Sequence, residues 1–241
     1  MAKSERFHAY VLHKRPYRET SMLVDFFTLE QGRMSAVAKG ARGNVKSDRK
    51  SLLQGFQKSE LDLSGRSNLK NLGKIEASGV AFSLNEKALY CGFYLNEILS
   101  RALPDGEPFE DLFANYEHTL LQLSSVKSNE LRSLEPILRE FELSLLHTMG
   151  YLPDFEHDCE SEKPIQADYA YYFDAASGFV QTHPANKLAI MGIDILEMTK
   201  GEYFDDDKQS VRRAAKIVCR AALRHLIGDK PIKSRELFLL T

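Results

Sequence analysis

The sequence predicts an α+β protein in which an N-terminal five-stranded barrel is followed by a helical domain with a small irregular insert. Five short apolar runs, separated by turn-forming residues, fill residues 7–77, and this spacing is typical of a small closed barrel. After Gly79 the apolar residues recur mainly at helical spacing. We therefore expect four segments: a barrel at 1–80, a first helical part at 81–150, an insert at 151–185 and a second helical part at 186–241.

The five expected strands are separated by clear turn signals. Pro16, Gly32, Gly40 and Gly43 lie in the breaks, where proline and glycine favour turns. The first candidate for such a barrel is the oligonucleotide/oligosaccharide-binding (OB) fold, although a small SH3-like barrel fits the strand count nearly as well. The strands are expected at Phe7–Leu12, Met22–Thr28, Arg33–Lys39, Phe56–Leu63 and Leu69–Ala77.

Four long helices are expected after the barrel, because apolar residues recur there at intervals of three and four. They cover residues 88–102, 109–123, 136–149 and the stretch that ends at Gly228. Pro136 suits the first turn of its helix, and Gly150 suits the end. The acidic residues at 205–207 are expected to cap the last helix, where they would also favour its dipole.

Charge is unevenly distributed along the chain, although the net charge is only −2. Residues 1–80 contain 15 Lys and Arg against 8 Asp and Glu, whereas residues 81–207 contain 8 against 24. Between residues 208 and 235, nine cations again accompany a single acid. Charge asymmetry bears on binding partners, and here it predicts one surface for a polyanion and a separate acidic surface for another partner.

The stretch from Val37 to Lys50 contains five cations, one acid and two glycines directly after an expected strand. Glycine lets a backbone approach a ligand closely, and spaced cations can neutralise successive phosphates. This pattern predicts a loop that holds the phosphates of a polyanion, a contact that carries no base preference, and a solvated basic hairpin tip is the alternative. The expected phosphate contacts are Lys39, Arg42, Lys46, Arg49 and Lys50, with Arg33, Arg66, Lys70 and Lys74 as further candidates.

Two more groups of residues are candidates for DNA contact. Aromatic residues can stack on bases, although on strands they more often belong to the core; the candidates are Tyr10, Tyr17, Phe26, Phe27 and Phe56. Cations at four-residue steps follow one side of the last helix, and this second patch contains Arg212, Lys216, Arg220, Arg224, Lys230, Lys233 and Arg235. It would bind DNA or an acidic partner, or it would be a solvated face that neutralises the acidic middle of the chain.

Catalytic patterns are weak, and we expect no enzyme. The sequence has no Gly-x-x-x-x-Gly-Lys-Ser/Thr loop for ATP and no Gly-x-Ser-x-Gly elbow, and Ser144 and His147 lack a third partner. The acids at 205–207 could hold Mg²⁺ in a nuclease, but successive residues at a helix start point in different directions, so capping explains them better.

The sequence also indicates the cellular compartment. No apolar run approaches the ~20 residues of a bilayer span, and the first residues do not resemble a signal peptide. Cys91, Cys159 and Cys219 are far apart and odd in number, which does not fit a disulfide framework. We expect a cytoplasmic, nucleoid-associated protein with neither a membrane nor a small-molecule partner.

Short motifs recur along the chain in a specific order. The N-terminal ones are Glu-Thr-Ser at 19–21, Phe-Thr-x-Glu-x-Gly at 27–32 and Lys-Gly-Ala-Arg at 39–42. The later ones are Leu-Arg-x-Phe-Glu-Leu-x-Leu-Leu at 138–146, Met-Gly-Tyr at 149–151 and Pro-x-Lys-Ser-Arg-Glu-Leu-Phe at 231–238. Together, from about residue 7 to 238, they make the sequence resemble the family of the bacterial recombination mediator RecO.

The resemblance implies an OB barrel, a helical domain and a task in DNA repair and homologous recombination without cofactor turnover. It implies binding of single- and double-stranded DNA, annealing of complementary strands and, with RecR, assistance in loading RecA onto DNA covered by the single-stranded-DNA-binding protein. It also implies that Arg139 and Leu143 help to form a pocket for the acidic, phenylalanine-ended tail of that protein. The alternatives are an adaptor with only weak DNA contact and a metal-dependent nuclease.

Some members of this family carry a four-cysteine zinc finger in the insert, and this chain departs from that pattern. It has Cys-Glu-Ser-Glu at 159–162 in place of the first cysteine pair and Gln-Thr-His-Pro at 181–184 in place of the second. Cys159 with His157 and His183 would be a poor ligand set for zinc. We therefore expect a degenerate, metal-free zinc finger, a hairpin-like unit held by the aromatic residues at 169–173.

Overall fold

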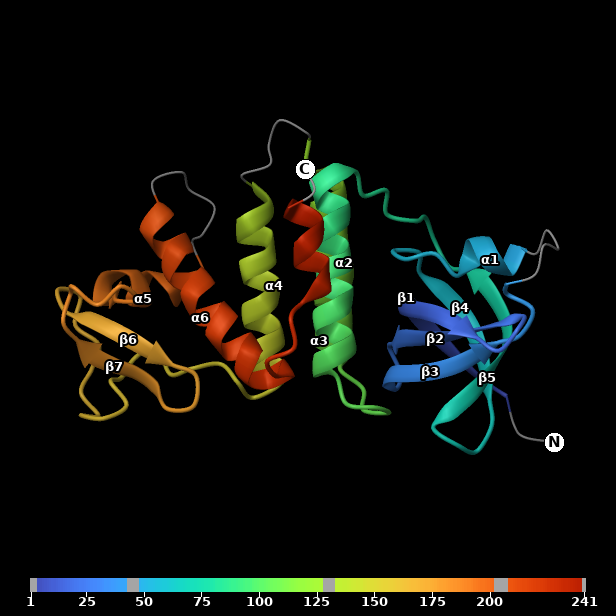
Figure 1. Ribbon diagram of the computed structural model, residues 1–241, viewed down its shortest axis with the longest axis horizontal. Helices are drawn as coiled ribbons and strands as arrows, with labels where there is room; N and C mark the ends of the chain where they lie inside the picture. Colours follow the sequence, from blue (N-terminus) through green and yellow to red (C-terminus); the bar gives the residue numbers. More distant parts are fainter. Residues whose placement is uncertain (1–3, 43–47, 128–132, 202–207, 240–241) are drawn as a thin grey trace. The chain divides into compact units, whose positions relative to one another are not determined.

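The computed structural model describes residues 4–42, 48–127, 133–201 and 208–239, except for the side chains of residues 48 and 49 (Figure 1). The chain forms two compact units. The first comprises Met1–Val126 together with Ile232–Thr241, and the second comprises Lys127–Pro231. The first unit therefore contains the barrel, the first two long helices and the end of the chain.

A closed five-stranded barrel forms the N-terminal part of the first unit, with the strand order β1-β2-β3-β5-β4. Neighbouring strands are antiparallel, apart from β3 and β5, which pair in parallel. This architecture is that of an OB barrel followed by a helical region, and it confirms the predicted fold class. The strands are β1 (Glu5–Tyr17), β2 (Ser21–Thr28), β3 (Gly32–Ala38), β4 (Ser59–Ser64) and β5 (Leu69–Ala77).

The first strand is longer than predicted. It continues past Leu12 and through Pro16 to Tyr17. Because β1 pairs with β4 only over residues 5–9, Pro16 lies in an arm that β1 forms with β2. Proline lacks an N–H group, and it is tolerated where a strand has a neighbour on one side only. The arm carries the β1–β2 turn beyond the body of the barrel.

The interior of the barrel is filled by side chains that alternate along the strands, as the pleat of β-structure requires. Val24 and Phe26 of β2 are fully buried in the same core cluster as Ala36 and Ala38 of β3. Small and large side chains thus fill the interior together, and the loops at the barrel edge remain available for other tasks.

Two helices cover one side of the barrel. Tyr10 and Phe27 lie outside the barrel's core cluster and pack against Phe113 and Tyr116 of α3, with ring centroids 5.1 to 6.1 Å apart. These contacts explain why α3 belongs to the same compact unit as the strands. The helical segments of this unit are α1 (Asp48–Leu52), α2 (Glu86–Ala102), α3 (Glu110–Ser125) and the 3₁₀ segment η2 (Lys233–Leu239).

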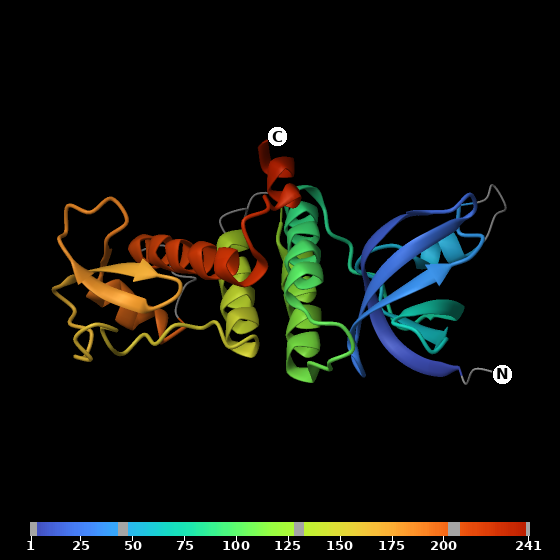
Figure 2. The same cartoon turned by 60° about the horizontal axis from the view of Figure 1, so that its bottom comes forward.

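The end of the chain returns to the first unit as η2, which lies beside α2 (Figure 2). The carboxylate of Glu97 in α2 accepts the backbone N–H groups of Lys233 and Ser234, at 2.9 and 2.8 Å. Burial works to raise the pKa of Glu97, but these N–H groups outweigh burial and hold the pKa below its ordinary value. The first N–H groups of a helix lack partners within it, so Glu97 anchors η2 by capping it.

In the second unit, α4 and α6 pack against each other, and a small sheet of order β7-β6-β8 lies next to them (Figure 1). The sheet and the short helix α5 extend the predicted hairpin-like insert. The described part of α6 has Lys208 at its N-cap position; residues 205–207, which were predicted to cap this helix, lie outside the described ranges. The elements are α4 (Leu134–Thr148), β6 (Ala170–Asp174), β7 (Gly178–Thr182), β8 (Ile190–Met191), α5 (Gly192–Met198) and α6 (Gln209–Ile227).

Candidate nucleic-acid interface

The segment after β3 presents two of the predicted phosphate contacts to solvent. Lys39 and Arg42 are exposed, whereas Ala41 between them is buried in the barrel core. Gly40 has a φ of 73°, a left-handed conformation that glycine adopts without strain. A buried alanine and a glycine turn therefore determine where the two cations leave the barrel.

This segment is hydrogen-bonded to the β1–β2 turn. The backbone N–H of Arg42 donates to the carbonyl oxygen of Thr20 at 3.0 Å, and its guanidinium donates to that of Arg18 at 3.1 Å. Arg18 is itself exposed, so cations from two distant stretches of sequence meet at one edge of the barrel. Sequence reasoning missed Arg18, although the loop after the first strand of an OB barrel is a known ligand-binding loop.

The parallel pairing of β3 with β5 brings a further cation to this edge. Ala36 lies opposite Lys70 and Val37 opposite Asn71, so Lys70 lies close to the strand end that carries Lys39. The Lys70 ammonium donates to the carbonyl oxygen of Gly65, at 3.2 Å, in the β4–β5 turn. Arg66, in the same turn, is exposed.

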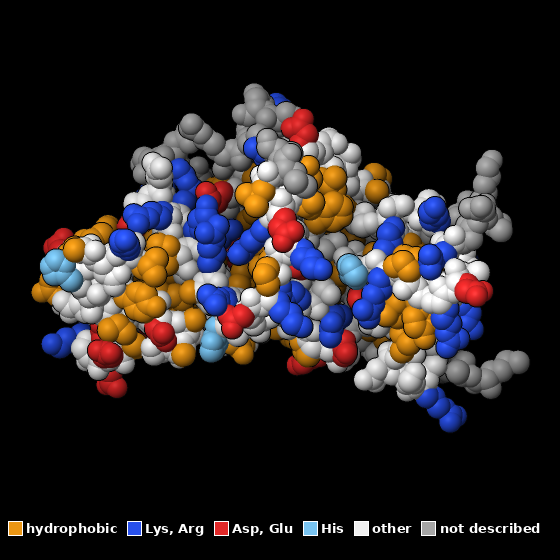
Figure 3. Space-filling model, in the orientation of Figure 1, with side chains coloured by type: hydrophobic (Ala, Val, Ile, Leu, Met, Phe, Trp, Pro, Cys, Tyr) orange, Lys and Arg blue, Asp and Glu red, His pale blue; other side chains and the backbone are white. Residues whose placement is uncertain are grey.

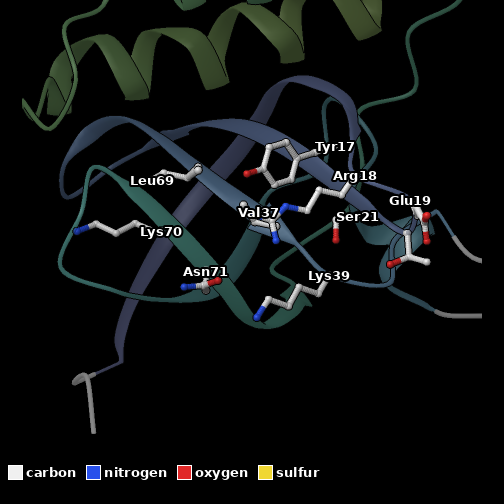
Figure 4. Close-up of a pocket in the computed structure, with 10 residues that line it drawn as sticks. Tyr17, Arg18, Glu19, Ser21, Val37, Lys39, Leu69, Lys70 and Asn71 are labelled. Atoms are coloured by element: carbon white, nitrogen blue, oxygen red, sulfur yellow. The ribbon is translucent and has the colours of Figure 1, made fainter.

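A cavity of about 630 Å³ lies where these segments meet (Figure 4). Its walls are the β1–β2 turn, the end of β3 and the start of β5. The lining residues include three cations, Arg18, Lys39 and Lys70, against one acid, Glu19. We refer to this cavity as the barrel-edge pocket; it brings together two predicted phosphate contacts and one that was missed.

The remaining predicted phosphate contacts of the barrel differ in their exposure and in their partners. Lys50 is exposed on α1, whereas Lys46 and the side chain of Arg49 lie outside the described part of the chain. The ammonium of Lys74 is 2.8 Å from the carboxylate of Glu76, and both side chains are largely exposed. A DNA contact by Lys74 would therefore compete with an existing ion pair.

Arg33 corrects one prediction. Its guanidinium donates to the carbonyl oxygen of Ser100 at 2.8 Å and pairs with Asp105 at 2.9 Å. Arg33 thus links β3 to the end of α2 and the turn that follows it. A side chain engaged in this way is a structural connection, and we leave it out of the interface.

Most aromatic candidates belong to the core. Phe26 fills the barrel interior, Tyr10 and Phe27 pack on α3, and Phe56 contacts the ring of Phe93 in α2; all four candidates are at most 5% exposed. Base stacking by these four, as the structure stands, is ruled out by burial. Tyr17 alone of the five is half-buried, and it lines the barrel-edge pocket.

The cations of α6 form a basic strip on the second unit, and Figure 3 shows Lys and Arg side chains gathered over this helix. Lys216 pairs with Glu135 of α4 at 3.0 Å, and Arg224 pairs with Asp229, so part of the strip is neutralised. The strip comprises Arg212, Lys216, Arg220 and Arg224, together with the exposed Arg213, which the prediction omitted.

Lys233 and Arg235 do not belong to the same compact unit as the basic strip. They lie in η2 of the first unit, whereas Lys230 still belongs to the second. The guanidinium of Arg235 lies 5.3 Å from the ring centroid of Tyr94 and donates to its hydroxyl at 3.2 Å. The predicted C-terminal patch is therefore divided between two units.

Arg139, a predicted partner contact, lies in a buried ion pair. It is 6% exposed, and its guanidinium lies 2.6 Å from the carboxylate of Glu142, which has no exposed surface. Leu143 is half-buried. The resemblance implied that Arg139 offers its guanidinium to a terminal carboxylate, whereas in the structure this guanidinium is buried against Glu142 within the second unit.

The candidate zinc ligands in the insert do not face one another as a ligand set; each has its own local contacts or is exposed. The His157 ring lies 3.0 Å from the Asp154 carboxylate, the His183 ring accepts the N–H of Ala185 at 3.1 Å, and Cys159 is exposed. Within the described ranges, no group of three or more His, Cys, Asp or Glu is arranged to hold a metal ion. The residues present do not fit a zinc finger.

Asp158, which sequence reasoning missed, connects two stretches of the insert through hydrogen bonds, where a zinc finger would use a metal ion. Its carboxylate accepts the backbone N–H groups of Glu160 and Ser161, at 3.0 and 2.7 Å, and that of Gln181 at 2.6 Å. Burial works to raise the pKa of Asp158, but the N–H groups of Ser161 and Gln181 outweigh it and hold the pKa below its ordinary value. The carboxylate of Asp158 thus joins residues 158–161 to Gln181. These are the two stretches that correspond to the cysteine pairs of a zinc finger.

These observations define the class of protein: an OB-type barrel with a cationic edge, followed by a helical region. Among the described residues, no helix is long and apolar enough to span a bilayer.

The chain belongs to the recombination protein O family. The family model described as "Recombination protein O N terminal" matches residues 1–80, and "Recombination protein O C terminal" matches residues 85–236. A DNA repair protein RecO of Alteromonas mediterranea is 46% identical over 98% of this chain and 97% of its own length. The proteins of the same name from Cellvibrio japonicus and Haemophilus influenzae are 42% and 41% identical, over at least 94% of every chain compared. The predicted family is confirmed, and the chain is a DNA repair and recombination protein.

Proposed function

We propose that this protein binds single- and double-stranded DNA through the cationic edge of its barrel and anneals complementary strands. With RecR, it assists the loading of RecA onto DNA covered by the single-stranded-DNA-binding protein. The observation that supports the DNA contact is the convergence of Arg18, Lys39 and Lys70, from three separate elements, on one pocket with a single acid. Cations so arranged bind the phosphate backbone, which carries no sequence information.

Annealing of this kind requires no catalytic group, because a protein that neutralises phosphates lowers the repulsion between two strands. Lys39 and Arg42 are suited to this, since both are exposed at the edge of the barrel. The protein therefore needs neither ATP nor a metal ion for the proposed activity.

Fluorescence anisotropy with labelled single-stranded and duplex DNA tests the interface. Replacing Lys39 and Arg42 together by glutamine should weaken binding to both forms. Each lost contact should also flatten the plot of log affinity against log salt by about 0.9 on duplex and about 0.7 on single strands. Lys187, an exposed cation of the second unit, provides the matched control as Lys187→Gln. Unchanged affinity of the double variant at fixed salt would remove the barrel from the proposal.

Strand annealing is tested with two complementary oligonucleotides, of which one carries a fluorophore and the other a quencher. The protein should accelerate quenching without ATP and in the presence of a chelator, and it should continue to do so when the strands are covered by the single-stranded-DNA-binding protein. An effect on bare strands alone would support DNA binding but not the mediator role. Shortening of labelled DNA in Mg²⁺ that Asp205→Asn abolishes would instead favour a nuclease.

The partner pocket at Arg139 and Leu143 stays a prediction. Calorimetry with a short acidic peptide ending in phenylalanine, on wild type and Leu143→Ala, tests it directly. Arg139→Glu is a poor probe because it would place a second carboxylate against the buried Glu142, so Arg139→Lys is preferred. If the peptide binds tightly while DNA binds weakly and without dependence on Lys39, the protein is an adaptor.

A further inference from the structure

The barrel-edge pocket combines an aromatic ring with cations, and phosphate binding alone does not require the ring. Tyr17 lies at the end of β1, where its ring is half-buried. In Figure 4 it lies on the same side of the pocket as Leu69, which is 37% exposed. An aromatic and an aliphatic side chain at the surface thus provide an apolar wall on which a flat group can rest.

The polar groups of the pocket lie where a nucleotide would need them. The guanidinium of Arg18 lies 5.3 Å from the ring centroid of Tyr17, and Lys39 and Asn71 lie across the pocket from the ring (Figure 4). Lys39 and Lys70 are cations at the ends of paired strands. The pocket therefore offers a stacking surface, an amide that can hydrogen-bond a base edge, and cations for phosphate.

The volume of the barrel-edge pocket and the cations beside it favour a nucleotide of a DNA strand as the occupant. A volume of about 630 Å³ is in the range of small-molecule sites and admits a single nucleotide. Arg42 lies next to the pocket through its hydrogen bonds to the β1–β2 turn, so cations continue beyond the pocket along the barrel edge. A continuing chain of phosphates matches this arrangement better than an isolated phosphate ion, which would use neither the ring nor Arg42.

We infer that the barrel-edge pocket binds one unpaired nucleobase of single-stranded DNA, stacked on Tyr17, with the adjacent phosphates at Lys39 and Lys70. This inference rests on the proposed function and goes further, because it makes part of the binding depend on a base. A base within a duplex is stacked and paired, so the pocket contributes to the binding of single strands only. Aromatic stacking tolerates every base, which suits a protein that acts on any sequence.

The test compares an oligothymidylate with an abasic strand of equal length, which carries the same phosphates without bases, and with a blunt duplex. Wild type should bind the oligothymidylate more tightly than the abasic strand. Tyr17→Leu should lose about fivefold or more in affinity for the oligothymidylate, and it should keep its affinity for the abasic strand and the duplex. Tyr17→Phe keeps the ring and should bind like wild type, which controls for folding. Lys39→Gln should weaken all three complexes.

The outcomes separate the inference from the proposed function. If wild type binds the oligothymidylate and the abasic strand equally, or if Tyr17→Leu weakens all three ligands alike, the base pocket is overturned while DNA binding by the barrel stands. Failure of every strand to bind would overturn both. Equal loss in Tyr17→Phe and Tyr17→Leu would also overturn the stacking role, since the ring alone would then not be what the DNA recognises.

Discussion

Arg18 shows, at the scale of single residues, how local strain and a binding role coincide. Its φ of 52° lies in the left-handed region, where a residue with a Cβ is disfavoured by roughly 1 kcal/mol or more. Its side chain is exposed above the ring of Tyr17 and lines the barrel-edge pocket. We interpret this strain as the cost of presenting a cation at the pocket.

Replacing Arg18 with glycine is expected to separate stability from binding. Glycine adopts φ of 52° without strain, so the free energy of unfolding should be unchanged or higher by up to about 1 kcal/mol. Affinity for single-stranded DNA should fall severalfold, because a pocket cation is lost. Urea denaturation and fluorescence anisotropy measure the two quantities. Arg18→Ala, which keeps the strain, should lose the same affinity without the gain in stability; full DNA affinity in Arg18→Gly would contradict the role.

The buried pair of Arg139 and Glu142 makes a second residue-scale prediction. Removing one partner leaves the other charge buried, so Arg139→Met should lower the free energy of unfolding by about 3–5 kcal/mol. The double variant with Glu142→Leu should recover most of that loss, because apolar residues can replace a buried ion pair. Chemical denaturation followed by circular dichroism measures both. A single variant as stable as wild type would show that the pair is not buried in solution.

At the scale of elements, Asp158 determines how the insert is held. Without it, the backbone N–H groups of Glu160, Ser161 and Gln181 lose their acceptor, and this carboxylate no longer ties the two stretches to each other. Asp158→Ala should therefore increase hydrogen exchange in residues 158–163 and 178–182 at neutral pH. Asp154→Ala, which removes a more exposed carboxylate of the same loop, is the matched control.

The pH dependence of the insert follows from the same carboxylate. Its pKa is lower in the folded protein than the ordinary value near 3.8, so its stabilising effect is present above that value and is lost as the pH falls through the folded pKa. Wild type should lose protection in the insert on acidification below about pH 4. Asp158→Asn should be less protected at neutral pH and should lose less on acidification. Identical pH profiles for the two proteins would refute the role of Asp158.

Most elements could be predicted from periodicity, and the exceptions have physical reasons. The strand from Leu69 to Ala77 and the helix near 88–102 carry clear local patterns, and they appear where expected. The extension of β1 through Pro16 depends on the absence of β4 along that stretch, which is a tertiary property. The short helices α1 and α5 span 5 and 7 residues, too few for a helical repeat to stand out.

At the scale of the whole molecule, the basic strip of α6 poses the question of what binds to the second unit. If DNA contacts the strip, Arg212→Gln and Arg220→Gln together should reduce the salt slope on duplex DNA by about 0.9 for each residue. If an acidic protein partner binds there, the slope should not change, and binding of that partner should weaken. Salt titrations of duplex binding measure this, with Lys187→Gln again as the control.

The sequence by itself determined the fold class, the family and the charge asymmetry, because periodicity, motif order and composition are all properties of the linear chain. It also predicted Lys39, Arg42 and Lys70 as phosphate contacts, and the structure places Lys39 and Lys70 in the lining of the barrel-edge pocket. Only the tertiary structure decided that Arg18 and Tyr17 line the pocket with them, and that Arg33 and Arg139 are engaged in other contacts. The reason is that burial and pairing depend on residues far away in the sequence. A cation that is available to DNA therefore has the same local pattern as one that holds the fold together.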